Sequence, residues 1–304
     1  MTLEQLRIFV AVAQHLHVTR AAEELHLTQS AASAAIAALE ARHNVRLFDR
    51  VGRRMELTAA GLALLPEARL LLQNARNAET VLDDLTGLRR GTLSIAASQT
   101  VLGYWLPERL AQFAQSHPAI RLNILGGNTA QAVQAVVDGQ AELGFVEGEV
   151  ESDLLAHKTV STDRIAIYAA PDHPLSRKRI RAEDLAKAQW VLREEGSGTR
   201  AHFEKAMRGA GVDCARLGIA MTLPSNEAAL AATAKSKLLT AVSELAAAPH
   251  VAAGLVARLR FALAERRFDM LRHRARGESR AAAALIGVLA GSADGVATGR
   301  KRNG

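Results

Sequence analysis

Cysteine is almost absent from this chain, which has one, Cys214, among 304 residues. A single cysteine excludes an intrachain disulfide, and such usage suits a reducing compartment. We interpret Cys214 as an ordinary buried or half-buried thiol rather than a redox sensor. Apolar runs are short as well, and none approaches the roughly 20 residues of a membrane-spanning helix. The N-terminus has the pattern of a working helix and not of a signal peptide. We therefore expect a cytoplasmic protein without membrane partners.

Motifs of the common enzyme classes are also missing. Gly196-Ser197-Gly198 is not a G-x-S-x-G nucleophile elbow. No G-x-G-x-x-G opens a helix after the first strand of an α/β region. His15 and His17 stand two apart and lack the carboxylate or cysteine cluster of a metal site. We predict no catalytic residue, no metal and no cofactor, and so not an enzyme. A formal net charge of +7 instead favours polyanionic partners.

Residues 18–37 have the pattern of two short helices joined by a tight turn. Apolar residues fall at helical spacing on one face of each helix: Val18, Ala21, Ala22 and Leu25 in the first, and Ala32, Ile36 and Leu39 in the second with its continuation. Thr28 stands where an N-cap belongs. Gln29, Ser30 and Ser33 follow it as short polar side chains that can reach base edges and phosphates. This layout is typical of a DNA-reading helix-turn-helix. A helical hairpin inside a core is the alternative.

The segment after the second helix favours DNA binding over that alternative. Asn44 suits the left-handed position that ends a helix. Arg50, Arg53 and Arg54 then cluster around Gly52 between short apolar runs. A basic hairpin beside a recognition helix is a wing that holds the phosphate backbone. A solvated turn would explain three arginines equally simply, but not their place beside this helix pair.

Residues 59–89 predict one long linker helix. Apolar residues alternate at spacings of four and three, the seam of a two-stranded coiled coil: Leu64, Ala68, Leu71, Ala75, Ala78, Leu82 and Leu85. Pro66 should kink this helix or begin a new segment. A homodimer formed through it would read a partial inverted repeat in double-stranded DNA. The alternative is a single amphipathic helix that packs on its own domain.

From residue 90 the pattern changes to alternating strands and helices. Strands are expected at 91–98, 120–124, 142–146, 164–169, 189–192, 219–223, 238–242 and 268–273. One helix is expected from Thr100 to Ser116, and a last helix at 279–289. Alternation of this kind predicts a parallel sheet covered on both faces. Residues 291–304 are rich in Gly and polar residues and are expected to form a disordered tail.

Ligands of such sheets bind beyond the carboxyl ends of the strands. Small polar residues follow several of the expected strands and open helices. Free N–H groups at helix starts favour an anion. The sequence therefore predicts a small anionic effector in a cleft, and the residues expected around it are Ser98, Thr100, Asn128, Thr129, Glu147, Ser197 and Thr199. Each could also be a plain helix cap. Arg200 is expected to pair with the ligand or with Glu194, Glu195 or Glu204.

The N-terminal region resembles the winged helix-turn-helix of LysR-type transcriptional regulators. The matching segments are Leu3-Glu4-Gln5-Leu6-Arg7-Ile8-Phe9-Val10-Ala11-Val12-Ala13, Thr19-Arg20-Ala21-Ala22-Glu23-Glu24-Leu25, Thr28-Gln29-Ser30-Ala31-Ala32-Ser33, Leu39-Glu40, Leu47-Phe48-Asp49-Arg50 and Leu57-Thr58-Ala59-Ala60-Gly61. Two departures stand out: Ser30 replaces a common Pro, and alanines replace longer side chains at Ala34, Ala35, Ala37 and Ala38. We therefore expect few direct base contacts and more reliance on the wing and on DNA shape.

The resemblance implies a fold and a function for the whole chain. It implies a DNA-binding domain at 1–58, a linker at 59–89, and a two-lobed effector domain at 90–290 shaped like periplasmic binding proteins. Lobe one would comprise 91–162 with 265–290, and lobe two 163–264. It also implies a regulator controlled by an effector, a homotetramer, and RNA polymerase as a candidate partner. The runs 29–33, 146–148 and 192–200 look most like the branch that governs sulfur-assimilation and carbon-fixation genes. A nonspecific nucleoid-type DNA binder and a small-molecule carrier are the alternatives.

Overall fold

The computed structural model describes residues 1–51, 54–85 and 91–299. The chain divides into two compact units, which are described separately: Met1–Arg89 with Val137–Gln140, and Arg90–Val136 with Ala141–Gly304. Arg53, one of the predicted wing residues, lies outside the described residues, as do linker positions 86–89 and the last five residues of the predicted tail.

The first unit is built on three helices, α1 (Leu3–His15), α2 (Val18–Glu24) and α3 (Gln29–His43). Their apolar faces meet in one core that includes Phe9, Val12, Ala21, Ala32 and Leu39. The helix boundaries follow local rules that are visible in the sequence. Thr28 Oγ1 accepts a hydrogen bond from the Ala31 N–H at 3.2 Å, which confirms Thr28 as the N-cap of α3. Asn44 ends α3 in the left-handed region at φ 52°.

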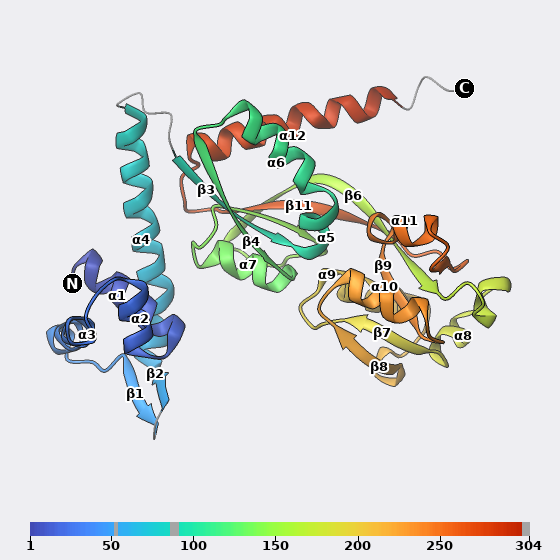
Figure 1. Ribbon diagram of the computed structural model, residues 1–304, viewed down its shortest axis with the longest axis horizontal. Helices are drawn as coiled ribbons and strands as arrows, with labels where there is room; N and C mark the ends of the chain where they lie inside the picture. Colours follow the sequence, from blue (N-terminus) through green and yellow to red (C-terminus); the bar gives the residue numbers. More distant parts are fainter. Residues whose placement is uncertain (52–53, 86–90, 300–304) are drawn as a thin grey trace. The chain divides into compact units, whose positions relative to one another are not determined.

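A two-stranded antiparallel hairpin follows α3. Strand β1 (Phe48–Val51) pairs with β2 (Arg54–Leu57), so that Phe48 lies opposite Leu57 and Val51 opposite Arg54. The Phe48 ring packs on the ring of Phe9 with centroids 5.5 Å apart, which fixes the base of the hairpin on the helical core. The hairpin therefore adjoins the three helices (Figure 1).

Helix α4 (Ala59–Leu85) continues without interruption through Pro66. No new segment begins at Pro66, contrary to one of the two outcomes expected from the sequence. Pro66 is exposed, and it removes one hydrogen bond from a helix otherwise rich in Ala and Leu. The seam residues Leu64 and Ala68 pack into the core of their own unit, whereas Leu71 is 41% exposed. The start of the seam is therefore used within the unit, and Leu71 remains open.

The second unit contains a nine-stranded sheet. The strand order is β4-β3-β5-β11-β6-β9-β7-β8, and β10 pairs with β6. The strands are β3 (Gly91–Ser98), β4 (Ile120–Gly127), β5 (Leu143–Glu147), β6 (Leu155–Ala169), β7 (Gln189–Arg193), β8 (Gly218–Leu223), β9 (Leu239–Ser243), β10 (Ala257–Arg258) and β11 (Glu265–His273).

This sheet is mixed, and the expectation of a parallel sheet holds for only part of it. Strand β3 runs parallel to β4 and β5, and β7 runs parallel to β8 and β9. Strand β11 is antiparallel to both β5 and β6, and β6 is antiparallel to β9. The long strands β6 and β11 thus connect two parallel halves, and their ladder is irregular between Phe268 and Asp269.

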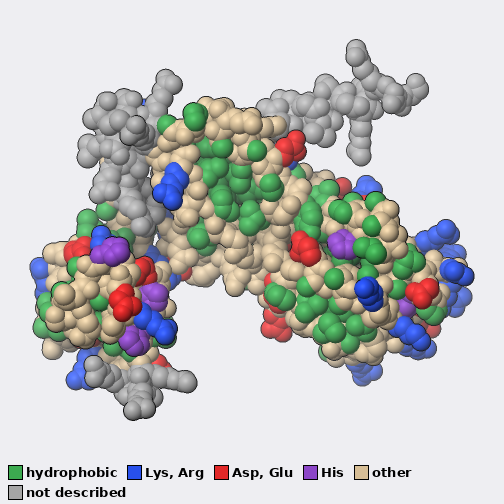
Figure 2. All heavy atoms as spheres, viewed as in Figure 1, with side chains coloured by type: hydrophobic (Ala, Val, Ile, Leu, Met, Phe, Trp, Pro, Cys, Tyr) green, Lys and Arg blue, Asp and Glu red, His purple; other side chains and the backbone are tan. Residues whose placement is uncertain are grey.

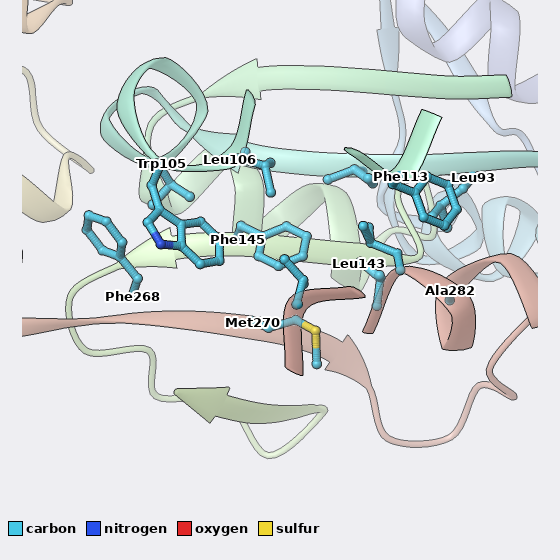
Figure 3. Packing of buried hydrophobic residues seen from close by; sticks show 14 of the residues in the cluster. Leu93, Trp105, Leu106, Phe113, Leu143, Phe145, Phe268, Met270 and Ala282 are labelled. Carbon is cyan, nitrogen blue, oxygen red and sulfur yellow. The ribbon is translucent and has the colours of Figure 1, made fainter. Parts of the chain in front are cut away.

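Two of the apolar cores on this sheet each contain a tryptophan. The first core combines β3, β5 and the middle of β11 with α5 (Gln99–Tyr104), α6 (Leu106–Ser116) and α12 (Arg280–Gly299). Figure 3 shows Trp105 beside Phe145 and Phe268 in this core, with ring centroids about 6 Å apart in both pairs (6.2 and 6.1 Å). The second core surrounds Trp190 and Phe203, whose ring centroids lie 4.6 Å apart.

The remaining helices cover the sheet (Figure 1). They are α7 (Thr129–Val137), α8 (Ala182–Ala186), α9 (Gly198–Gly209), α10 (Asn226–Ala234) and α11 (Glu244–Ala252), with short 3-10 turns at Pro174–Arg177 and Cys214–Arg216.

Two helix expectations need correction. The helix expected from Thr100 to Ser116 is two helices, α5 and α6, which meet at Trp105. Pro107 stands in the first turn of α6 and cannot donate to the carbonyl four residues earlier, so a continuous helix would lose a bond there. At the other end, α12 extends to Gly299, where a disordered tail was expected from residue 291. Residues 291–299 contain two alanines but also three glycines and no leucine, so intrinsic helix propensity does not explain this extension of α12.

Candidate functional site

The start of α3 presents small polar side chains to solvent. Thr28, Gln29 and Ser30 are exposed, and Ser33 is half-buried one turn later. Gln29 Nε2 donates to Ser33 Oγ at 2.9 Å, and the Thr28 and Ser30 hydroxyls lie 3.1 Å apart. Ala34, Ala37 and Ala38 are exposed too, so this helix face has no long side chain that would hold it away from a groove. Its chemistry is that of a surface that can approach duplex DNA closely.

The hairpin β1–β2 holds two of the three predicted wing arginines in its strands. Arg50 pairs with Met55 across the ladder, and Arg54 pairs with Val51. Arg53 lies outside the described residues. The backbone therefore places Arg50 and Arg54 at the end of a hairpin that adjoins the helix-turn-helix, as a wing requires.

Six of the seven residues predicted for the effector are buried in the second unit. These are Ser98, Thr100, Thr129, Glu147, Ser197 and Thr199. They lie at the carboxyl ends of β3 and β5 and at the N-termini of helices α5, α7 and α9. Residues that stand 18 to 52 positions from Glu147 in the sequence thus meet around it in one polar cluster.

Glu147 is the centre of this cluster. Ser98 Oγ donates to its carboxylate, Thr199 Oγ1 donates to the other carboxylate oxygen at 3.4 Å, and Arg266 Nη1 lies 3.8 Å from it. Thr129 Oγ1 donates to the Glu147 carbonyl at 3.1 Å and accepts from the Gly198 N–H at 3.1 Å. Backbone and side chain of Glu147 are therefore both held.

Arg266 was missed by sequence analysis. Its guanidinium is almost fully buried, and it donates to Asp163 Oδ2 at 2.9 and 2.6 Å and to Thr199 Oγ1 at 3.1 Å. Ser243 completes the set by donating to the other Asp163 oxygen at 2.8 Å. Six of the nine residues of β11 are charged or titratable, so nothing in the sequence of this strand singled out Arg266 as the buried one.

Arg193 is the second buried arginine that sequence analysis missed. It forms a two-pronged pair with Glu194 at 2.8 and 3.0 Å and donates to Asn226 Oδ1 at 3.0 Å. Asn226 Nδ2 in turn donates to Thr100 Oγ1 at 3.2 Å, and Thr100 Oγ1 lies 3.4 Å from Thr199 Oγ1. A chain of hydrogen bonds thus links Arg193 to the Glu147 cluster.

The side chains of Asn128 and Arg200 make their hydrogen bonds outside the cluster around Glu147. Asn128 Oδ1 accepts from the Gln131 N–H at 3.0 Å, its own N–H donates to Gln131 Oε1, and its amide donates to the Glu195 carbonyl at 3.3 Å. It therefore caps α7 and contacts the loop before α9. Arg200 pairs with Glu204 at 2.7 Å, one of the partners that the sequence left open.

Two features at the start of α9 bear on ligand binding. Ser197 is the N-cap residue, but its hydroxyl makes no capping bond and is buried without a partner. Gly198 lies so close to the cluster that an added Cβ would stand 2.1 Å from the Glu147 carbonyl oxygen and 2.6 Å from Thr129 Oγ1. Only glycine permits this approach. The Ser197 hydroxyl has no hydrogen-bond partner and can therefore bind a ligand atom.

Charged pairs line the neighbourhood of the cluster. The Tyr104 hydroxyl donates to Glu227, and burial followed by this contact raises the tyrosine pKa above its ordinary value. Lys205 pairs with Glu149, and their hydrogen bond is the main cause that lowers the pKa of this fully exposed carboxyl.

Exposed Lys and Arg residues also gather at the end of the second unit around α8 (Figure 2): Arg177, Lys178, Arg179, Arg181 and Lys187.

Within residues 1–51, 54–85 and 91–299, no group of three or more His, Cys, Asp or Glu residues could hold a metal ion. Among the described helices, none is long and apolar enough to span a bilayer.

Comparisons with known proteins agree with both halves of this description. Residues 3–62 match the family described as bacterial regulatory helix-turn-helix proteins of the lysR family, and residues 86–294 match the LysR substrate binding domain. The uncharacterized HTH-type transcriptional regulator YeiE of Escherichia coli K12 is 38% identical over 200 residues, which cover 66% of this chain and 67% of YeiE. The RuBisCO operon transcriptional regulator of Allochromatium vinosum is 37% identical over 244 residues, covering 80% of each chain.

The fold is also found in a solved structure. Full-length CbnR complexed with its target DNA superposes with a TM-score of 0.67 at 23% identity, covering 96% of this chain and all of CbnR. A winged helix-turn-helix joined to an α/β effector domain defines a class of DNA-binding transcriptional regulators rather than enzymes. The chain belongs to the LysR family of this class. The resemblance to regulators of carbon-fixation genes is confirmed by the RuBisCO operon regulator among its relatives.

Proposed function

We propose that this regulator reads promoter DNA with the start of α3 and with the wing. Gln29, Ser30 and Ser33 would contact the major groove with Thr28 beside them, while Arg50, Arg53 and Arg54 would hold the phosphates. The observation that supports this most is the exposure of these small polar residues on a helix with the N-cap and hairpin of a winged helix-turn-helix. Because α3 has few long donors, the wing and DNA shape would supply much of the affinity. Its place of action would be the cytoplasm, with RNA polymerase as a further partner.

Gel shifts at several salt concentrations test this proposal. The DNA would be the fragments upstream of the gene for this chain and of its neighbours. Arg53→Ala should weaken binding and reduce the salt slope by about one, because each phosphate contact releases counterions. Gln29→Ala should weaken binding with less change in slope. Gln112→Ala and Arg216→Ala, at exposed positions of the second unit, serve as controls. An unchanged affinity and slope for Arg53→Ala would remove the wing assignment.

We also propose that the chain forms a dimer through α4, and a tetramer from two such dimers, on a partial inverted repeat. Leu71 supports the dimer because it continues the heptad seam and is 41% exposed. Leu62 is 61% exposed and lies nine residues away, about half a turn round the helix, so it is a matched control. Sedimentation should show that Leu71→Glu weakens self-association while Leu62→Glu does not. Equal behaviour of the two variants would contradict the seam.

The effector that we propose is a small anion bound in the polar cluster of the second unit. The hydroxyls of Ser98, Thr100, Thr129, Ser197 and Thr199 support this, since each can donate to an oxyanion. The free Ser197 hydroxyl and the N-terminus of α9 add donors at one end of the cluster. Isothermal titration of the full chain with sulfite, sulfate and small carboxylates tests the class of ligand. No heat from any of them would count against an anion.

A further inference from the structure

The carboxylate of Glu147 already holds the position that an anion would take in this cluster. Ser98 donates to one of its oxygens, and Thr199 donates to the other at 3.4 Å. Arg266 Nη1 lies 3.8 Å from that second oxygen. Two hydroxyls and a guanidinium around a carboxylate are the donors that bind carboxylate and phosphate oxygens in general. Glu147 itself is 2% exposed, so this arrangement is closed to water.

Repulsion between buried charges disfavours a second anion beside the Glu147 carboxylate. Glu147 and Asp163 are two buried carboxylates, and Arg266 is the cation that contacts both. An anion placed beside Glu147 would bring a third negative charge into a region of low dielectric, where repulsion between like charges is strong. An incoming anion therefore has to take the donors from Glu147.

The backbone around Glu147 permits such an exchange. Its carbonyl is held by Thr129, and Gly198 packs against the same carbonyl, so the end of β5 is fixed. The next residue, Gly148, adopts φ +99°, and Gly198 lies at ordinary contact distance from the position of its missing Cβ. Exchange of the donors would therefore require only rotation of the Glu147 side chain about its own bonds, while the strand stays in place.

We propose that Glu147 is an internal ligand, a carboxylate of the chain that fills the anion site until an effector anion displaces it. The inference rests on the proposed anion site and deepens it. It assigns Glu147 a role in setting effector affinity: the effector must compete with a tethered carboxylate. An anion with more oxygens than a carboxylate, or one that also reaches Ser197, has the advantage.

Chemical rescue with acetate tests the inference. Glu147→Ala leaves the donors without a carboxylate, so sodium acetate should raise the thermal unfolding midpoint of this variant relative to sodium chloride at equal ionic strength. By isothermal titration the variant should bind acetate and sulfate at least about tenfold more tightly than the unaltered chain. Glu149→Ala is the matched control, because Glu149 lies two residues on and pairs only on the surface with Lys205.

A second variant keeps the test decisive if Glu147→Ala does not fold. Glu147→Gln retains an acceptor for Ser98 but removes the charge, and should also bind sulfate more tightly than the unaltered chain. Binding by the unaltered chain with no gain in either variant overturns the internal ligand and leaves the anion site standing. No binding of acetate or sulfate by any of the proteins overturns the anion site, and the internal ligand with it.

Discussion

Arg266 and Asp163 form a buried ion pair in which two guanidinium nitrogens donate to one carboxylate oxygen, at 2.9 and 2.6 Å. Asp163 lies on β6 and Arg266 on β11, and the two residues are partners in the antiparallel ladder. The pair therefore connects the two strands that join the halves of the sheet. Arg266 also donates to Thr199 and lies close to the Glu147 carboxylate.

Loss of one member of this pair should be costly. Arg266→Met leaves Asp163 buried without its cation, and should lower the free energy of unfolding by about 3–5 kcal/mol. Adding Asp163→Asn should recover part of that loss, because the uncompensated charge is then gone. Urea unfolding measures both effects. The exposed pair Arg164–Glu265 in the same ladder is the control, and Glu265→Gln should cost less than about 1 kcal/mol. Equal costs for Arg266→Met and Glu265→Gln would contradict this account.

Substitution of Gly198 should disrupt the polar cluster around Glu147. An alanine Cβ would stand 2.1 Å from the Glu147 carbonyl oxygen, which is backbone and cannot move aside easily. We expect Gly198→Ala to destabilise the chain by about 1–3 kcal/mol and to lose anion binding. Gly209 ends the same helix with nothing near its missing Cβ, so Gly209→Ala should be neutral or stabilise slightly. Denaturant unfolding measures the stability of both variants, and isothermal titration measures their anion binding. Equal behaviour of Gly198→Ala and Gly209→Ala would contradict the close contact at Gly198.

His202 should make the second unit sensitive to mild acid. Burial lowers the pKa of this histidine, while its hydrogen bond to the Ala264 carbonyl opposes that shift. The folded state then disfavours the protonated ring, so the stability from His202 is present above its ordinary pKa of about 6.5 and is lost as pH falls through the lowered value. The difference in unfolding free energy between the unaltered chain and His202→Gln should shrink between about pH 7.5 and 5. His157→Gln, at an exposed position, is the control. A difference in unfolding free energy between the unaltered chain and His202→Gln that grew as the pH fell would contradict the lowered pKa of His202.

The effect of the Thr28 N-cap on stability should be separable from the effect of the polar side chains of α3 on DNA affinity. Thr28→Ala removes the acceptor for the Ala31 N–H and should cost about 1 kcal/mol, whereas Thr28→Ser keeps the acceptor and should cost much less. Thermal unfolding of the full chain measures the first effect, and gel shifts show whether DNA affinity follows it. A serine variant as unstable as the alanine variant would show that the methyl group, and not the cap, matters at this position.

Local features of the fold could be predicted from the sequence because their causes lie within a few residues. Thr28 and Asn44 begin and end α3 through bonds and dihedral angles set by their own side chains. The alternation over Gly91–Ser98 likewise produced β3 with the expected bounds. The break at Trp105 has a local signal too, because Pro107 stands in the first turn of α6.

The rest depends on pairing between distant segments. Asp163 and Arg266 stand 103 residues apart, and nothing in either neighbourhood specifies the antiparallel register that brings them together. The same long-range pairing makes the sheet mixed rather than parallel. Glu147 was expected near the effector from its place at a strand end, but its bond to Ser98 and its contact with Arg266 need the assembled sheet.

Strands β6 and β11 have a further consequence for how this effector domain can change. The residues of the second core run in one uninterrupted stretch, from Ile165 to Leu259, and the strands by which the chain enters and leaves it pair directly, with Arg164 opposite Glu265. Its two ends are therefore neighbours in space. Such a stretch can be exchanged between related genes as a cassette, and a new ligand preference could arise in one recombination while the DNA-reading half stays as it was.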